Sequence, residues 1–201
     1  AIVVEDNCYA DVHFEGPIEP SLYALDDSPN IVYLSSLSKI LGAGIRLGYL
    51  YARPPMLERI LGRRYDGGNS MLAASICAEL FKDSLWDHIA QTNVILKEKR
   101  DAVFAGLEAS VGDICTWSRP VGGLFIWVGL PEDVDQNRLT DLARKRGIGF
   151  ARGSAFHIHN KEVPFLRLAF GFPSLDDIRE GIPLLGECIH QARAAEQVAA
   201  S

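Results

Sequence analysis

The residues best suited to chemistry gather around Lys39, between two apolar, strand-like runs. Ser36 and Ser38 precede the lysine, Arg46 follows it by seven residues, and glycines lie between the two cations. A lysine amine is a nucleophile that condenses with carbonyl compounds. Hydroxyls and a guanidinium fork bind phosphate oxygens. This segment therefore predicts a site for a ligand that carries both a carbonyl carbon and an anionic group.

Pyridoxal 5'-phosphate carries an aldehyde and a phosphate on one ring, so it matches this combination of groups. Lys39 closely follows the apolar run Ile31–Ser35, and α/β sheets bind ligands beyond the carboxyl ends of their strands. The alternative is a surface loop with a solvated lysine. Spacing alone does not decide between the two interpretations.

A second cluster, which contains Asp6 and Tyr9, directly follows the first apolar run of the chain. A carboxylate at a strand end can pair with a pyridine nitrogen and keep it protonated, which makes the ring an electron sink. The Tyr9 hydroxyl could then bond a ring oxygen. The alternative is that both residues cap a turn, and the cluster taken alone favours that alternative.

The elements that must position these residues follow from hydrophobic periodicity and turn signals. We expect a buried strand at 1–5, further strands at 31–35 and 47–52, and helices at 56–64, 71–80 and 86–107. Beyond them we expect strands at 122–128, 147–151 and 165–170, a helix at 137–146, and a last helix capped by Ser174. The Ala-rich end from Ala192 is expected to fray. This order predicts an α/β part at residues 1–86 and a small α+β domain at 87–201.

Composition limits the classes of protein to consider. The chain of 201 residues is 48% hydrophobic and 23% charged, which is typical of a soluble globular protein. A net charge of -6 argues against a nucleic-acid partner, and we expect no membrane span because every apolar run is too short. Four widely separated cysteines predict reduced thiols in the cytoplasm. His157 and His159 lack a nearby third ligand, so we expect no metal site.

Four segments in order resemble the C-terminal half of a fold-type I, pyridoxal-phosphate-dependent aminotransferase of class I/II. The resemblance is strongest to the branch of aminoadipate, kynurenine and aromatic aminotransferases. It covers most of the chain and rests on Val4–Tyr9, on Ser36–Gly48, on Pro120–Trp127 and on Leu166–Phe170. The resemblance implies the C-terminal part of a large, mostly parallel sheet domain, followed by a small α+β domain.

The resemblance also implies a role for each candidate residue. Lys39 would form the Schiff base with pyridoxal phosphate and then shuttle a proton. Asp6 would pair with the pyridinium, and Tyr9 would bond the phenolic oxygen. The phosphate would be held by Ser36, Ser38 and Arg46. Arg167 would bind the α-carboxylate of the substrate.

Several positions depart from the family pattern or extend it. Asn7 and Cys8 replace a common acidic–proline pair, with little effect expected on the site. Arg152 stands where a proline is usual, and it either favours an acidic substrate side chain or faces solvent. Asn69 and Ser70 match positions that reach toward a partner's phosphate, and a homodimer is implied.

The chain starts at Ala1 with a strand-like run, so we expect that it is part of a longer polypeptide. The first half of the family's site has no counterpart in these residues, so we expect that half to be required and these residues alone not to transaminate. The reaction implied moves an amino group between an amino acid and a 2-oxo acid. Two alternatives stay open: the effector-sensing domain of a transcription regulator, and a lyase or decarboxylase with the same cofactor.

Overall fold

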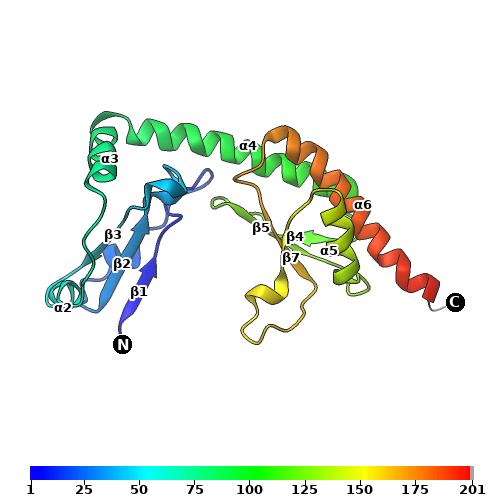
Figure 1. Cartoon of the computed structure of the whole chain (residues 1–201), viewed down its shortest axis with the longest axis horizontal. Helices are drawn as coiled ribbons and strands as arrows, with labels where there is room; N and C mark the ends of the chain where they lie inside the picture. Colours follow the sequence, from blue (N-terminus) through cyan, green and yellow to red (C-terminus); the bar gives the residue numbers. More distant parts are fainter. Residues whose placement is uncertain (200–201) are drawn as a thin grey trace. The chain divides into compact units, whose positions relative to one another are not determined.

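The chain forms two compact units, which are described separately. The computed structural model describes residues 1–199, with side chains as far as Arg193. The first unit contains residues 1–94 together with 121–123, and the second contains residues 95–120 and the chain from Leu124 onward. Figure 1 shows the elements of both units.

The first unit is built on a three-stranded sheet in the order β1-β2-β3. Its strands are β1 (Val3–Asp6), β2 (Ile31–Ser36) and β3 (Gly48–Ala52). β1 runs parallel to β2, with Asp6 opposite Leu34, whereas β3 runs antiparallel to β2. Because β1 and β2 are parallel, their carboxyl ends lie at the same edge of the sheet (Figure 1).

The expectation that the first strand is buried is wrong. Val3 is 42% exposed and Val4 is 57% exposed. β1 is an edge strand of this sheet, whereas the apolar core of the unit centres on Val32, Ala52 and Met56. This core therefore does not cover the side chains of β1.

The helices that follow β3 lie at nearly the expected places, and a further short helix lies between β1 and β2. α1 (Leu22–Leu25) is a short helix that the sequence did not predict, and α2 (Met56–Leu61) packs Leu57 and Ile60 against the core. α3 (Met71–Asp83) begins after Ser70, whose Oγ accepts from the Ala73 N–H at 3.3 Å. α4 (Leu85–Val111) belongs to the first unit up to Val94 and to the second unit beyond it.

The second unit contains a four-stranded antiparallel sheet in the order β4-β5-β7-β6. Its strands are β4 (Thr116–Trp117), β5 (Phe125–Gly129), β6 (Ala151–Arg152) and β7 (Phe165–Ala169), and its further helices are α5 (Gln136–Lys145) and α6 (Leu175–Ala199). Leu166 and Leu168 alternate with Phe165 and Arg167 along β7, and only the leucines are buried. One face of the sheet therefore joins the core, and the other carries Arg167.

Two expected strands of the second half differ in the structure. The strand expected at 122–128 begins only at Phe125, because Gly122 instead pairs with His13 in an isolated bridge. A Cβ at Gly122 would collide with the carbonyl oxygen of Val12, so only glycine fits there. Most of the strand expected at 147–151 is absent, since Gly147 has a φ of 75° and turns the chain after α5.

The start of the last helix is as predicted. The Ser174 Oγ accepts from the Asp177 N–H at 3.1 Å, and the Asp177 carboxylate accepts from the Ser174 N–H at 3.0 Å. This reciprocal pair caps α6. α6 continues to Ala199, so the Ala-rich end, which the sequence predicts to fray, is helical as far as that residue. The last two residues of this end, 200–201, lie outside the described residues. None of the helices described is both long enough and apolar enough to cross a membrane.

Candidate functional site

Two hydrogen bonds, one between backbone groups and one from a side chain, hold the ends of β1 and β2 together. The Asn7 N–H donates to the Leu34 carbonyl oxygen at 2.8 Å. The Ser35 Oγ, in turn, donates to the Asn7 carbonyl oxygen at 3.3 Å. Ser35 is buried, so this link is sheltered from water. The loops that carry the predicted residues Asp6, Tyr9 and Lys39 thus leave one edge of the sheet side by side.

Asp6 ends β1, and one of its carboxylate oxygens is held by Cys8. Its Oδ1 accepts from the Cys8 backbone N–H at 3.2 Å and from the Cys8 thiol at 2.7 Å. The thiol bond lowers the pKa of the Asp6 carboxyl, and the same bond raises the pKa of the Cys8 thiol. Asp6 is therefore an exposed carboxylate, held ionised at the sheet edge with one oxygen oriented.

Lys39 ends a short 3-10 helix, η1 (Leu37–Lys39), directly after β2. The Ser36 Oγ caps this turn by accepting from the Ser38 N–H at 3.2 Å. The Lys39 Nζ lies 5.4 Å from the centroid of the Tyr9 ring, within the range of a cation–π contact. The charge of Lys39 also acts on the Cys8 thiol, whose pKa it lowers against the larger effect of Asp6. The structure thus brings Lys39, Tyr9, Cys8 and Asp6 into one cluster.

The three predicted phosphate residues all lie in the segment between β2 and β3. Ser36 and Ser38 are half-buried in the turn that contains Lys39. Arg46 is exposed after η2 (Ala43–Ile45), in the left-handed region with a φ of 51°, and one of its nitrogens donates to the Ala43 carbonyl oxygen at 3.3 Å. Arg46 is thus folded onto its own loop, and the structure gives no bond that joins it to either serine among the described residues.

Arg167 lies in the second unit, on the face of β7 opposite the core. Its Cζ lies 4.0 Å from the centroid of the Phe125 ring and 4.4 Å from that of the Phe156 ring. The Arg167 Nε is buried without a hydrogen-bond partner. Two aromatic rings therefore flank a guanidinium that keeps an unpaired donor, and such a group suits an incoming carboxylate.

Arg152 is engaged by neighbouring side chains. Its guanidinium donates to the Asn137 Oδ1 and to the Glu162 carboxylate, both at 2.8 Å. The side chain is only 26% exposed. Arg152 is therefore an ion-paired residue of the second unit, and an acidic substrate side chain would have to compete with Glu162 for it.

Sequence reasoning missed two polar side chains of α4 that contact the loops of this cluster. The His88 Nε2 lies 2.7 Å from the Ile40 carbonyl oxygen, and the Asn93 Nδ2 donates to the Asp11 carbonyl oxygen at 2.9 Å. These bonds join residues 48 and 82 positions apart in the chain. No spacing rule within α4 could have found them.

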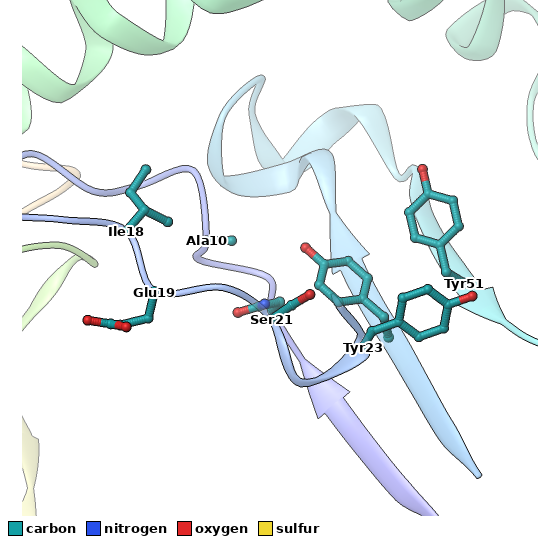
Figure 2. Close-up of a pocket in the computed structure, with 8 residues that line it drawn as sticks. Ala10, Ile18, Glu19, Ser21, Tyr23 and Tyr51 are labelled. Carbon is teal, nitrogen blue, oxygen red and sulfur yellow. The ribbon is translucent and has the colours of Figure 1, made fainter. Parts of the chain in front are cut away.

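Two hollows lie on the sheet of the first unit. One is lined by tyrosine rings, with Tyr23 and Tyr51 close together at a centroid distance of 6.2 Å (Figure 2). The other is lined in part by Asp6, Cys8 and Asn69, so it adjoins the cluster of predicted residues. Within residues 1–199, the structure holds no group of three or more side chains suited to bind a metal ion.

Comparison with known proteins gives a consistent result. The family model described as "Aminotransferase class I and II" matches residues 1–182. Aromatic-amino-acid aminotransferase 1 of Thermococcus litoralis is 32% identical over 94% of this chain and 46% of its own length. The 2-aminoadipate transaminase of Thermus thermophilus is 28% identical over 94% of this chain and 49% of its own. The chain thus spans about half the length of these relatives.

Solved structures agree with the sequence relatives. The α-aminoadipate aminotransferase of Thermus thermophilus, complexed with N-(5'-phosphopyridoxyl)-L-leucine, superimposes with a TM-score of 0.89 at 28% identity. This similarity covers 96% of this chain and 51% of that protein. An uncharacterised helix-turn-helix-type transcriptional regulator of Bacillus subtilis is also similar, at 32% identity over 92% of this chain and 38% of its own length. The chain therefore has the fold of fold-type I aminotransferases, and it is consistent with a C-terminal portion of that fold.

Proposed function

Because the chain belongs to the aminotransferase class I and II family, we propose that its protein is a pyridoxal-phosphate-dependent aminotransferase. The reaction moves an amino group from an amino acid to a 2-oxo acid in two half-reactions. The observation that carries this proposal is the cluster at the edge of the first sheet, where the Lys39 amine lies over Tyr9 and next to the Asp6–Cys8 pair.

The residues present fit pyridoxal phosphate. The cluster offers an amine for the aldehyde, an ionised carboxylate for the pyridine nitrogen, and a phenol for the ring oxygen. Cys8 occupies Oδ1 of Asp6 and orients the carboxylate, whose Oδ2 is the oxygen we assign to the pyridine nitrogen. The hydroxyls of Ser36 and Ser38, together with the Arg46 guanidinium, are the donors that we assign to the phosphate.

When bound, pyridoxal phosphate supplies a ring that accepts electrons from the α-carbon of the substrate. With the cofactor held there, the Lys39 Nζ would accept the proton from the α-carbon of the substrate and later release it, so this amine would act as the proton shuttle. Asp6 would keep the proton on the pyridine nitrogen, because the hydrogen bonds from Cys8 lower the pKa of the Asp6 carboxyl and favour its ionised form. The Tyr9 ring lies 5.4 Å from the Lys39 Nζ, within range of a cation–π contact.

Arg167 is proposed to bind the α-carboxylate of the substrate. The Phe125 and Phe156 rings lie near the Arg167 Cζ, and we assign the edge of the guanidinium to two parallel bonds with a carboxylate. The unpaired Nε is a donor already removed from water, so pairing it recovers a hydrogen bond that the structure otherwise lacks.

The rest of the site is proposed to come from a further segment of polypeptide. The relatives that this chain matches are about twice as long, which supports a required N-terminal half. We also propose a homodimer, with Asn69 and Ser70 directed to the partner's phosphate. A cytoplasmic location is consistent with the free thiols of all four cysteines, three of them buried.

A half-reaction tests this proposal. Candidate amino acids are added to the full-length protein loaded with pyridoxal phosphate, and the absorbance of the bound cofactor is followed. We expect conversion to the pyridoxamine form with at least one amino acid, and its loss in a Lys39→Ala variant. A Lys39→Ala variant that converts at the normal rate would show that another group moves the proton.

A second candidate function is the effector-sensing domain of a transcription regulator. The similarity to the Bacillus subtilis regulator, at 32% identity, supports it. The sequence upstream of Ala1 discriminates the two, since a helix-turn-helix domain there would favour the regulator. Analysis of the half-reaction products distinguishes an aminotransferase from a lyase or decarboxylase with the same cofactor. Only transamination converts the amino acid to its 2-oxo acid and leaves the cofactor in the pyridoxamine form.

A further inference from the structure

The two loops that carry the cluster are both tethered by α4, which is not part of the sheet. His88 bonds the carbonyl oxygen of Ile40, the residue directly after Lys39. Asn93 bonds the carbonyl oxygen of Asp11, which lies two residues after Tyr9. Both bonds are partly buried and both lie within the first unit.

The His88 bond fixes the end of the turn that presents Lys39. η1 is only three residues long, and its terminal carbonyl groups lack partners within the helix. A carbonyl oxygen can only accept, so the proton of the bond must be carried by the His88 Nε2. The Ile40 side chain is buried as well, so backbone and side chain both hold the residue next to Lys39.

The Asn93 bond does the same for the loop after β1. That loop closes through two internal bonds, from the Ala10 N–H to the Asn7 carbonyl and from the Val12 N–H to the Tyr9 carbonyl. These bonds set the shape of the loop, whereas Asn93 attaches it to α4 at 2.9 Å. One continuous helix therefore holds both loops at a fixed separation.

We propose that His88 and Asn93 are positioning residues, through which α4 sets the spacing between Lys39 and the Asp6–Tyr9 loop. A site built on loops keeps its geometry only when neighbouring groups lock those loops. The inference rests on the proposed function, because it assigns these bonds to support of the cofactor site.

Hydrogen exchange on the full-length protein, measured without cofactor, tests the tethers themselves. We expect His88→Leu to speed exchange of the amides at 37–41 roughly threefold to tenfold, as for the loss of one partly buried hydrogen bond. Asn93→Leu should do the same at residues 8–12. His88→Gln keeps a donor and should restore slow exchange. Unchanged exchange in both leucine variants would overturn the inference.

A matched control comes from the same helix. The Lys99 Nζ donates to the Gly171 carbonyl oxygen at 3.1 Å, so Lys99→Met removes a similar bond that lies wholly within the second unit. It should leave exchange at 37–41 and 8–12 unchanged. If His88→Leu fails to fold, Asn93→Leu decides the outcome, and unchanged exchange at 8–12 in that variant would overturn the inference.

The dissociation constant of pyridoxal phosphate separates this inference from the proposed function. Each leucine variant should bind the cofactor roughly threefold to tenfold more weakly than the wild type. Wild-type protein that binds the cofactor at Lys39, together with leucine variants of unchanged affinity and exchange, would refute only the tethers. Wild-type protein that does not attach the cofactor at Lys39 would refute the proposed function, whatever the exchange data show.

Discussion

Replacing Phe156 with leucine should weaken the hold of Arg167 on a substrate carboxylate. The Phe156 ring stands 4.4 Å from the Arg167 Cζ and is 47% exposed. At exposed sites, a cation–π contact contributes about 0.5–1 kcal/mol. Leucine keeps apolar volume but loses the ring, so the guanidinium loses one of its two aromatic supports. That energy corresponds to a roughly twofold to fivefold weaker interaction with the carboxylate.

Steady-state kinetics of the full-length enzyme with its amino-acid substrate measures this effect. We expect KM to rise by that factor and kcat to stay within about twofold, because the lost contact acts on binding. Phe156→Tyr keeps a ring and should match the wild type. Phe165→Leu is the matched control, since Phe165 lies on the same face but stacks on Trp127 at 5.5 Å. Equal KM values for Phe156→Leu and the wild type would refute the reasoning, as would a KM rise of the same size in Phe165→Leu.

Three further predictions concern the thiol, a helix cap and a close backbone approach. Asp6→Asn should speed the labelling of Cys8 by iodoacetamide at pH 8, because the bond to Asp6 raises the pKa of the thiol. Mass spectrometry measures the labelling rate, and an unchanged rate would contradict this bond. Ser174→Ala should lower the free energy of unfolding by about 1 kcal/mol in urea titrations. The hydrogen bonds to Ser174 lower the pKa of Asp177. The stabilisation from this pair should therefore be complete above about pH 4 and fade as the pH falls through the folded-state pKa. If Ser174→Ala lowered the free energy of unfolding equally at pH 2 and pH 7, that result would contradict the cap. Gly122→Ala should cost roughly 1–3 kcal/mol in the same titrations, because a Cβ there meets backbone, and a neutral effect would contradict the close approach.

Local signals predicted the elements well where the cause lies within a few residues. The Ser174 cap, the strand before Lys39 and the strand at β7 all depend on neighbours in sequence. The four motifs and their order along the chain were likewise visible in the sequence. The family match to residues 1–182 confirms the fold class that they predicted.

Burial and long-range partners could not be predicted in this way. An apolar run such as that of β1 predicts a strand but cannot tell whether anything covers it, and here Val4 stays largely exposed. Arg152 offered either a substrate contact or a solvated charge, whereas the structure pairs it with Glu162, ten residues away. The His88 bond to the Lys39 loop spans 48 residues and leaves no trace in local spacing. The roles of Lys39, Asp6, Tyr9, Ser36, Ser38, Arg46 and Arg167 stay predictions.

The most direct test of the central claim is to find which lysine holds the cofactor. Full-length protein is loaded with pyridoxal phosphate, reduced with sodium borohydride, digested, and its peptides are sequenced by mass spectrometry. The account predicts a phosphopyridoxyl group on Lys39, at close to one per chain, and none on the matched Lys99 of α4. Labelling spread over several lysines, or located on a lysine other than Lys39, would contradict it.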